Sequence, residues 1–499
     1  MDGGYRQSGG LIAALQVSGG HALGLKAADK FLSKTIGGNA GLEFHIGAQS
    51  RRRDGHVKWP AAQRRRVVVQ AARGHRNEVH EAFTAHMNSH IFIVSVIMNY
   101  RPNFHLAPPQ GRLNDPNGVF VDGDTLHVYY QHDPAFPRKP KRTGWGHATA
   151  SVSAPTPWQH HPDALYPDLP YDKNGCYSGG AVVDGTDVWL FYTGNLKEDG
   201  RRTPSQNRVR AIDPSGPEGG IYLRDENNPL IPDSPEGYTG HFRDPQITRD
   251  GDGWRMVIGA QTEDERGTIV LYRSQDLAQW EFQGEISFDD PSQLPGGYMW
   301  ECPNLLTLGD KQVLIFCPQA ETDRCGYIVG TLDGLDFHIE RGFTPLDHGT
   351  QFYAPQATED GILLGWMGMP AQDDTPTEGW VHTLTLPRRI WLEDNYLHQA
   401  PLWSALPETH GREGFGSTID IKGEGSFALI DADGDEAFRV TQQDGTIAFN
   451  GGDPIDCPAG EMRLIADGCA VEVYAGGGRI AASFAVFGEA PWQGWEPRG

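Results

Sequence analysis

The sequence predicts an all-β protein whose main part is a five-bladed β-propeller, and two observations carry this prediction. The chain of 499 residues contains 63 Gly and 35 Pro with little helical periodicity, as is typical of turn-rich β proteins. In addition, one short motif, a polar turn between two apolar strands, recurs along the central part of the chain. The length allows two or three domains, so the propeller is not expected to be the whole protein.

The motif recurs five times, and each copy is expected to form one blade. The copies start near Asn114, Ser178, Arg243, Glu301 and Tyr353, and their strands read VFVDGDTLHVYYQ, AVVDGTDVWLFYTG, ITRDGDGWRMVIGAQ, LLTLGDKQVLIFCPQ and, more weakly, QATEDGILLGWMG. Units of roughly 50–65 residues built from short antiparallel strands are typical of a propeller. Helical arrays would need a 3.6-residue periodicity, which these units lack.

Charge separates the first 97 residues from the rest. They carry 13 basic and 6 acidic residues, a net charge of +7, whereas the remainder carries −30. We expect residues 1–97 to be a poorly ordered extension, or to precede a true start at Met98; a tail that binds polyanions is the alternative. The apolar run 91–98 is far shorter than the about 20 residues that span a bilayer, and residues 1–30 lack a signal-peptide pattern.

The overall composition excludes several classes of partner. A formal net charge of −23 argues against nucleic acid and anionic membranes. The six cysteines show neither a CxxC pair nor zinc spacing: Cys176, Cys302, Cys317, Cys325, Cys457 and Cys469. Without a signal peptide, a cytoplasmic location with reduced thiols is the expectation.

Three carboxylates stand at corresponding positions of the repeat. Asp115 alone would pass for part of an Asn-Asp-Pro-Asn-Gly turn, in which Pro presets φ and Asn-Gly accepts a positive φ. In a propeller, however, the starts of the innermost strands converge at one end of the central channel, and Asp115, Asp244 and Glu301 occupy these starts. Like charges held together cost energy unless function or hydrogen bonding compensates. We therefore expect a functional site rather than three turns.

The motifs around these carboxylates resemble the signature blocks of glycoside hydrolase family 32, which contains invertases, sucrose-6-phosphate hydrolases, inulinases and levanases. The three blocks are Asn114-Asp115-Pro116-Asn117-Gly118, Arg243-Asp244-Pro245 and Glu301-Cys302-Pro303. Secondary blocks match as well: Tyr130-Gln131, Trp145-Gly146-His147, Tyr177-Ser178-Gly179, Phe352-Tyr353-Ala354-Pro355-Gln356 and Gly365-Trp366-Met367. The resemblance covers about residues 101–400.

The resemblance implies a five-bladed propeller followed by a β-sandwich. We expect the propeller over residues 98–400 and a sandwich over residues 405–499, where the strands FALIDA, FRVTQQ and AVEVYAGGG are visible. This second module is short for the family, so a trimmed or irregular sandwich is expected. The chain also departs from the family at Gly180, where Ser is frequent, and in residues 1–97, which have no counterpart.

The resemblance further implies a retaining hydrolysis of terminal β-D-fructofuranosides through two carboxyl groups. Asp115 would be the nucleophile, and Glu301 the general acid and base, kept protonated by the negative charge of Asp115. Asp244 would bind fructose hydroxyls and stabilise the transition state. For Arg243, two roles are equally compatible with the sequence: a sugar contact and a structural salt bridge. No metal or other cofactor is required.

Further side chains are expected around the fructose. Asn114, Gln131, Trp145 and Ser178 are assigned as sugar contacts, whereas Trp366 is open between the pocket and the core. His132 and His147 are interpreted as packing or hydrogen-bonding residues, because three acids already supply the proton chemistry.

The substrate is expected to be a small sugar: sucrose, sucrose 6-phosphate or a short fructo-oligosaccharide, with fructans less suited to a cytoplasmic enzyme. Propeller glycosidases that act on arabinans or xylans and a non-catalytic sugar-binding propeller are the competing hypotheses. The cationic segment 138–142 is expected to be a solvated loop at the mouth of the funnel, with phosphate binding as the alternative. The sequence does not indicate an oligomeric state.

Overall fold

The computed structural model describes residues 100–138, 141–320, 324–370, 372, 375–404, 406–408, 416–488 and 490–498. It also describes the backbone of four short strands nearer the N-terminus. Of these, β1 (Ile12–Leu15) pairs with β4 (Phe92–Ser95), and β2 (Phe44–Ile46) pairs with β3 (Arg65–Val67). The expectation of a poorly ordered extension over residues 1–97 otherwise falls outside the described residues.

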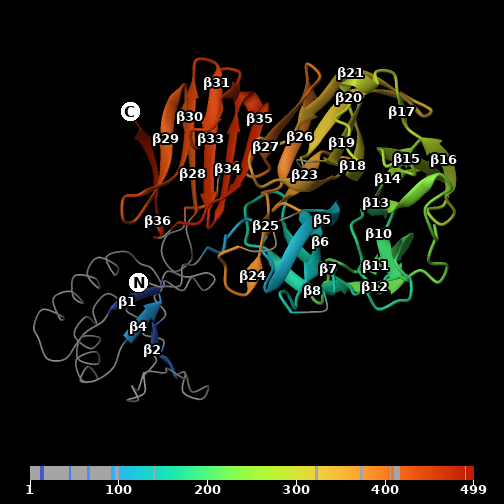
Figure 1. Ribbon diagram of the computed structural model, residues 1–499, viewed down its shortest axis with the longest axis horizontal. Helices are drawn as coiled ribbons and strands as arrows, with labels where there is room; N and C mark the ends of the chain where they lie inside the picture. Colours follow the sequence, from blue (N-terminus) through green and yellow to red (C-terminus); the bar gives the residue numbers. More distant parts are fainter. Residues whose placement is uncertain are drawn as a thin grey trace, which may run out of the picture.

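Five mainly antiparallel sheets follow one another along the chain and form a ring, which confirms the predicted all-β propeller (Figure 1). The first blade contains β5 (Gly111–Asp122), β6 (Thr125–Asp133), β7 (Gly144–Ser151) and β8 (Gln159–Leu165). The second contains β9 (Ala181–Asp184), β10 (Asp187–Glu198), β11 (Arg201–Ile212) and β12 (Ile221–Arg224). The third contains β13 (Tyr238–Asp250), β14 (Gly253–Thr262), β15 (Gly267–Ser274) and β16 (Glu281–Glu285).

The last two blades carry short additions. The fourth contains β18 (Met299–Leu308), β19 (Lys311–Gln319), β20 (Gly326–Asp333) and β21 (Asp336–Pro345), with β17 (Ser287–Phe288) parallel to β21 and the 3-10 helix η1 (Pro291–Gln293) before β18. The fifth contains β22 (Tyr353–Ala357), β23 (Ile362–Met367), β26 (Arg388–Glu393) and β27 (Tyr396–Pro401), with β25 (Thr383–Leu384) beside β23.

The ring is closed by a late segment that joins the first blade. Strand β24 (Trp380–Val381) lies parallel to β5, and the Gly111 amide donates to the Gly379 carbonyl at 2.8 Å. Five residues after Gly379, the Leu384 amide donates to the Leu106 carbonyl, also at 2.8 Å. The inner edge of the first blade is therefore completed by β24, a segment that comes after β22 and β23 of the fifth blade in the sequence.

Polar turns join the inner strands, as the repeat predicts, and apolar side chains fill the space between blades. Gly123 has φ +59° in the hairpin turn between β5 and β6, a conformation that favours glycine. Separate clusters of buried side chains lie between the first and second, second and third, and third and fourth blades. The largest cluster joins the fourth, fifth and first blades and reaches the C-terminal module.

The C-terminal module is a sandwich of two antiparallel sheets. One sheet contains β28 (Gly416–Lys422), β33 (Glu461–Asp467), β34 (Ala470–Ala475) and β35 (Ile480–Ala485). The other contains β36 (Trp492–Arg498), β29 (Gly425–Asp431), β30 (Glu436–Gln443), β31 (Thr446–Phe449) and β32 (Ile455–Asp456). The 3-10 helix η3 (Gly476–Gly478) precedes β35, and a cluster around Phe438, Leu464 and Val473 fills the sandwich.

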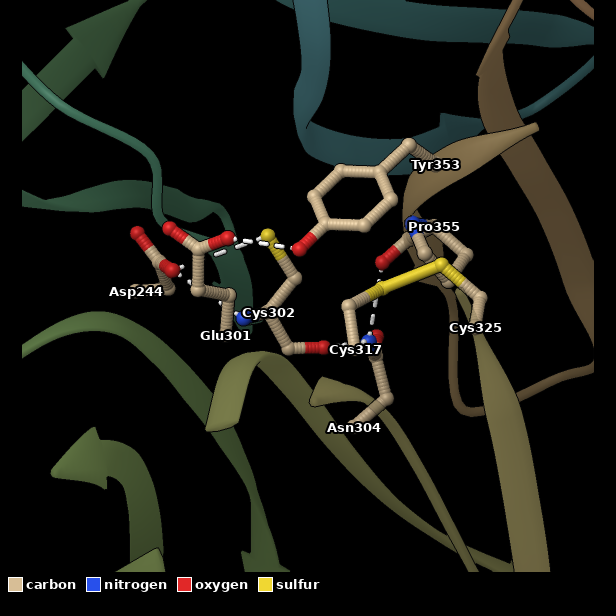
Figure 2. Close-up of a disulfide and its surroundings, with 8 residues drawn as sticks. All are labelled: Asp244, Glu301, Cys302, Asn304, Cys317, Cys325, Tyr353 and Pro355. Carbon is tan, nitrogen blue, oxygen red and sulfur yellow. Dashed lines mark hydrogen bonds between the residues drawn. A yellow bond between two sulfur atoms is a disulfide. The ribbon is translucent and has the colours of Figure 1, made fainter. Parts of the chain in front are cut away.

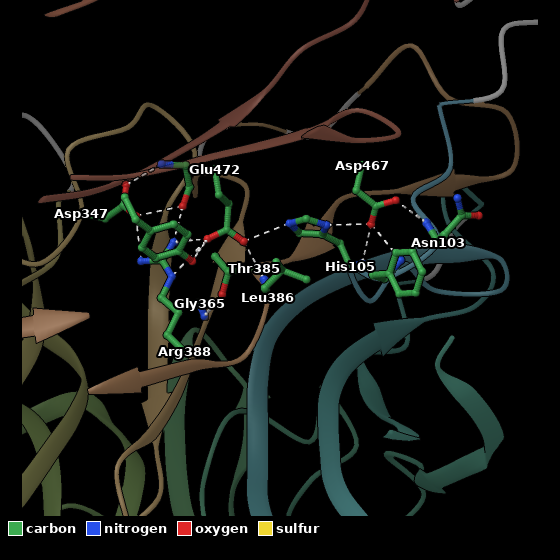
Figure 3. A network of polar contacts seen from close by, with 12 residues as sticks. Asn103, His105, Asp347, Gly365, Thr385, Leu386, Arg388, Asp467 and Glu472 are labelled. Carbon is green, nitrogen blue, oxygen red and sulfur yellow. Dashed lines mark hydrogen bonds and ion pairs between the residues drawn. The ribbon is translucent and has the colours of Figure 1, made fainter. Parts of the chain in front are cut away.

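A buried charge network joins the sandwich to the propeller (Figure 3). His105, just before the first blade, contacts Asp467 and Glu472 of the sandwich through its two ring nitrogens, each at 2.9 Å. Arg388 of the fifth blade contacts Glu472 at 2.7 Å and Asp347 at 2.9 Å. Burial opposes every one of these charges, so the pairs hold only because each charge has an opposite partner in hydrogen-bonding distance.

The network sets the ionisation of its members. Burial would lower the pKa of His105, but its hydrogen bonds to Asp467 and Glu472 raise the value to about 9. Burial would raise the pKa of Glu472, but Arg388 and His105 lower it to about 2. His105 is thus an imidazolium and Glu472 a carboxylate at neutral pH.

The cysteines differ from the expectation of six reduced thiols. Cys317 near the end of β19 and Cys325 just before β20 form a disulfide, and the other four are free and buried. Within the described residues, no helix is long and apolar enough to cross a bilayer.

Candidate active site

Each of four inner strands is interrupted near its start by a bulge that contains an X-Pro pair. The pairing registers shift between Leu113 and Pro116, between Arg243 and Gln246, between Glu301 and Asn304, and between Tyr353 and Gln356. Bulges bend a strand and redirect its side chains. The Asn-Asp-Pro-Asn-Gly segment is therefore not a turn before a strand, as its composition indicates, but part of β5 itself.

Three of these bulges hold a non-glycine residue in the left-handed region. The residue before proline has φ +67° at Asp244, +48° at Cys302 and +47° at Ala354. Such conformations cost of order 1–3 kcal/mol each and persist where the surrounding structure enforces them. All three stand in inner strands, directly before the proline of the bulge.

The first carboxylate, Asp115, lies in the bulge of β5 and is held by two predicted residues. Ser178 Oγ donates to Asp115 Oδ2 at 2.5 Å, and Gln131 Nε2 donates to the same oxygen at 3.0 Å. Burial raises the pKa of Asp115 to about 6; the Ser178 hydrogen bond opposes this shift and the charge of Glu301 adds to it. Asn114 lies half-buried next to Asp115 in the chain.

The second carboxylate, Glu301, is held from two neighbouring blades. Arg243 donates to Glu301 Oε1 from Nε at 3.0 Å and from Nη2 at 2.7 Å. Tyr353 Oη donates to Glu301 Oε2 at 2.8 Å (Figure 2). Of the two alternatives for Arg243, the structure therefore shows the salt bridge, and its partner is Glu301.

The third carboxylate, Asp244, is held by backbone. The Cys302 amide donates to Asp244 Oδ2 at 3.0 Å (Figure 2). The Asp244 amide in turn donates to Thr193 Oγ1 at 3.0 Å. Burial raises the pKa of Asp244, Arg243 opposes the shift, and the charges of Glu301 and Asp115 add to it. The three acids therefore lie within electrostatic range of one another, as the repeat predicts.

Both tryptophans considered for the pocket are buried. Trp145 has no exposed surface; its indole donates to the Tyr177 carbonyl at 3.1 Å, so in this conformation it cannot touch a sugar, and the expectation of a direct contact is corrected. Its physical role is to support the Tyr177–Ser178 segment from the core between the first and second blades. Trp366 is 2% exposed and packs edge-on against Tyr353 and His382, which favours the core alternative.

The histidines are structural, as expected. His132 Nδ1 lies 2.8 Å from Asp163 Oδ1, and His147 stacks on Tyr129 with ring centroids 4.3 Å apart. Burial, followed by the nearby His127 and His161, lowers the pKa of His147 to about 2. A ring that remains neutral in the core is not a candidate proton donor at neutral pH.

Sequence reasoning missed several residues of the site: Thr193, His241, Gln319 and Tyr353. Gln319 Oε1 accepts from Arg243 Nη2 at 3.2 Å, and His241 Nδ1 lies 3.2 Å from Arg243 Nη1. Tyr353 could have been found, because it starts the fifth repeat just as Glu301 starts the fourth. Thr193 lies in the middle of β10 and Gln319 at the end of β19, and only the structure shows that these second strands reach the site.

Comparison with known proteins gives a consistent result. Residues 105–401 match the family model of the glycosyl hydrolases family 32 N-terminal domain. The sucrose-6-phosphate hydrolase of Bacillus subtilis (strain 168) is 40% identical over 347 residues, which are 66% of this chain and 69% of the relative. That of Klebsiella pneumoniae is 39% identical over 344 residues, which are 65% and 72% of the two chains.

Solved structures show the same likeness. A variant of the β-fructofuranosidase of Bombyx mori, determined in complex with sucrose, is 28% identical with a TM-score of 0.68 and covers 80% of this chain and 91% of its own. The sucrose-6-phosphate hydrolase of Lactobacillus gasseri, at 24% identity, has the same TM-score and coverages and supports the fold alone.

Proposed function

The chain belongs to glycoside hydrolase family 32, and from this premise we propose that it hydrolyses the terminal β-D-fructofuranoside of sucrose or sucrose 6-phosphate with retention of configuration. The observation that supports this function is the convergence of Asp115, Asp244 and Glu301 from three blades. Each acid is held by its own hydrogen bonds. Ser178 and Gln131 donate to Asp115, the Cys302 amide donates to Asp244, and Arg243 and Tyr353 donate to Glu301. Two carboxyl groups are the machinery of a retaining glycosidase.

In the first step, Asp115 attacks the anomeric carbon of fructose while the bond from that carbon to the leaving oxygen breaks. Glu301 gives its proton to that oxygen, so glucose or glucose 6-phosphate departs neutral at the reacting atom. In the second step, Glu301 takes a proton from water, which attacks the same carbon and releases Asp115. Arg243 stabilises Glu301 in the carboxylate form that it holds between the two steps.

Asp244 acts on the sugar without forming a bond to it. Because its Oδ2 already accepts from Cys302, we assign Oδ1 to the fructose hydroxyls. Asn114, Gln131 and Ser178 complete the proposed fructose contacts. Gln131 and Ser178 also hold Asp115 in place, so their loss would affect both binding and attack.

Release of glucose and fructose tests the proposal against its alternatives. The purified protein is expected to release both sugars from sucrose, and fructose with glucose 6-phosphate from sucrose 6-phosphate. A non-catalytic sugar-binding propeller would bind these sugars and release neither. Hydrolysis of arabinan or xylan in place of any fructoside would contradict the proposed specificity.

A cytoplasmic location is part of the proposal. The reason for proposing it is the charge of a phosphorylated sugar. Such a sugar stays in the compartment where it forms, because ions do not cross a bilayer readily. The Cys317–Cys325 disulfide is a feature that reducing compartments disfavour. Alkylation of thiols in intact cells before lysis would show whether these two cysteines are paired in place, and an oxidised pair would count against the cytoplasm.

A further inference from the structure

Basic side chains gather beside Glu301, and the proposed hydrolysis of the fructosyl bond uses none of them. Strand β10 pairs with the segment around Ser178 through the Thr193 amide and then continues to Glu198. Its hairpin with β11 therefore extends past Ser178 at the same end of the ring as the carboxylates. Lys197 and Arg202 lie on this extension, and His241 lies two residues before Arg243.

Lys197 and Arg202 are held close to each other and to Arg243. They are directly opposite partners in the β10–β11 register, an arrangement that destabilises a sheet when the charges are alike. Burial, and next the charge of Arg243, lower the pKa of Arg202; burial, and next Arg202 and Arg243, lower that of Lys197. The chain thus concentrates positive charge at one point of the rim.

The neighbouring acids form their ion pairs with other cations. Asp233 pairs with Arg201, Glu198 pairs with Lys173, and Glu301 pairs with Arg243. Across the described part of the chain, no carboxylate forms an ion pair with Lys197 or Arg202. An arrangement of cations without counterions is the usual preparation for an anionic ligand.

His241 adds a neutral donor to the two cations. Arginine can only donate, so His241 Nδ1 accepts the hydrogen bond from Arg243 Nη1 at 3.2 Å and the ring hydrogen must stand on Nε2. Burial, and next the charges of Arg243 and Arg202, lower the pKa of His241 to about 4, so the ring is neutral at pH 7.

A cavity opens beside Arg202 and His241, and Lys197, which is not among its lining residues, lies opposite Arg202 on the hairpin. It has a volume of about 330 Å³ and is lined by Arg202, Tyr238, Gly240 and His241 together with the Arg201–Asp233 pair and Ser234. The backbone of Arg202 packs closely against this lining: a Cβ added at Gly240 would stand 2.7 Å from the Arg202 carbonyl oxygen. The cavity therefore has the Arg202 side chain in its wall, next to His241.

We infer that Lys197, Arg202 and His241 form a subsite for a phosphomonoester carried by the leaving sugar. Glu301 protonates the leaving oxygen, so groups beside Glu301 on its outer side face the departing hexose and not the fructose. Two cations with one N–H donor suit the oxygens of a phosphate dianion. The inference rests on the proposed hydrolase function and narrows its substrate to the phosphorylated disaccharide.

The test compares kcat/KM for sucrose 6-phosphate with kcat/KM for sucrose in one preparation. The wild type is expected to prefer sucrose 6-phosphate, and the variant Lys197→Ala/Arg202→Ala is expected to lower the ratio of the two values at least tenfold. The matched control is Arg210→Ala, which removes an exposed cation paired with Asp187 at the opposite end of the same hairpin. It is expected to leave the ratio unchanged.

Inhibition of sucrose hydrolysis separates binding from turnover and distinguishes the sources of phosphate. Glucose 6-phosphate is expected to inhibit the wild type more strongly than glucose does, and the double variant is expected to lose this difference. Stronger inhibition by inorganic phosphate than by glucose 6-phosphate would assign the subsite to free phosphate and overturn the inference.

The remaining outcomes also decide the matter. If the wild type hydrolyses both sugars and the double variant leaves the ratio unchanged, the subsite is wrong while the hydrolase function stands. If Arg138→Ala lowers the ratio of the two kcat/KM values and the double variant does not, the phosphate binds at the loop 138–142 instead. If the wild type hydrolyses neither sugar, the proposed function and the inference fail together.

Discussion

Tyr353 in the fifth blade donates a hydrogen bond of 2.8 Å to Glu301 in the fourth, so the proposed acid is held across a blade boundary. The hydroxyl donates to Oε2, whereas both hydrogen bonds from Arg243 go to Oε1. Tyr353 is buried, and its ring also packs against Trp366. The relationship makes Tyr353 a positioning residue for the proton transfer.

Tyr353→Phe is expected to lower kcat/KM for sucrose roughly 10- to 100-fold, because a hydrogen bond to a charged group contributes about 1.5–3 kcal/mol. A fructoside whose leaving group needs no proton should lose much less. Initial rates on both substrates measure the difference. Equal losses on the two substrates would mean that Tyr353 acts on the fructosyl ring and not through Glu301.

Substitution of the three acids should separate their roles. Asp115→Ala is expected to abolish turnover of every fructoside, since it removes the nucleophile of both steps. Glu301→Ala should cost about 10²- to 10⁴-fold on sucrose and less on an activated fructoside. Asp244→Asn should slow all fructosides alike. A folded and fully active Asp115→Ala protein would contradict the catalytic assignment.

The ionisation of Asp115 predicts the acid limb of the pH profile. The nucleophile must be a carboxylate, and burial raises its pKa to about 6, so kcat/KM should fall as the pH drops below about 6. Ser178→Ala removes a hydrogen bond that favours the charged form and should therefore shift the limb to higher pH. A shift to lower pH would show that another group governs the limb.

The buried network between propeller and sandwich should limit stability at high pH. His105 has its pKa raised to about 9, so its contribution is complete below the unfolded value of 6.5 and is lost as the pH rises through about 9. Glu472 has its pKa lowered to about 2, so its contribution is complete above the unfolded value of 4.5 and is lost as the pH falls toward 2. Thermal unfolding curves should show the network's full effect between about pH 4.5 and 6.5.

A single substitution tests the same network at constant pH. Glu472→Gln leaves His105 and Arg388 without their shared carboxylate and is expected to cost roughly 3–5 kcal/mol in the free energy of unfolding. The exposed pair of Lys422 and Glu461 is the control, and Glu461→Gln should change stability by less than about 1 kcal/mol. Equal effects of the two substitutions would contradict the structural role of the network.

Removal of residues 1–97 should leave folding and activity largely intact, because residues 100–105 make contacts that anchor the start of the propeller to the C-terminal module. Tyr100 Oη donates to the Gly488 carbonyl at 2.7 Å, and the amides of residues 103–105 donate to the Asp467 carboxylate at 2.8 Å. A chain that starts at Met98 keeps these contacts, whereas one that starts at Leu106 loses them and should unfold at a lower temperature. An insoluble or inactive protein starting at Met98 would show that the basic segment is structural.

The sequence allowed the fold and the three acids to be predicted for one physical reason. In a propeller, equivalent positions of a repeat converge, so Asp115, Asp244 and Glu301 could be placed together without any coordinates. The bulges could not be foreseen, since a segment such as Asn-Asp-Pro-Asn-Gly satisfies the composition of a turn and of a bulge equally well. Only the pairing on both sides, which makes β5 one continuous strand, distinguishes them.

The depth of a side chain and the pairing of cysteines required the structure. Whether Trp145 faces a sugar or the core depends on how the first two blades pack, and sequence patterns do not encode that packing. Cys317 and Cys325 pair because Phe316 and Gly326 are register partners, which places the next residues of the hairpin opposite each other. Spacing alone cannot give this register, because the length of the connecting loop is compatible with several.

The parallel pairing of β24 with β5 also has a consequence for synthesis on the ribosome. The first blade emerges early, but its inner edge has no partner until Trp380 and Val381 leave the exit tunnel, some 260 residues after the end of β5. Throughout that interval a nascent chain exposes unpaired backbone groups on an apolar strand, the feature that promotes strand-to-strand aggregation. Slow translation between the first and fifth blades would prolong this exposure, so the yield of native enzyme should depend on elongation rate and on chaperones that shield β5.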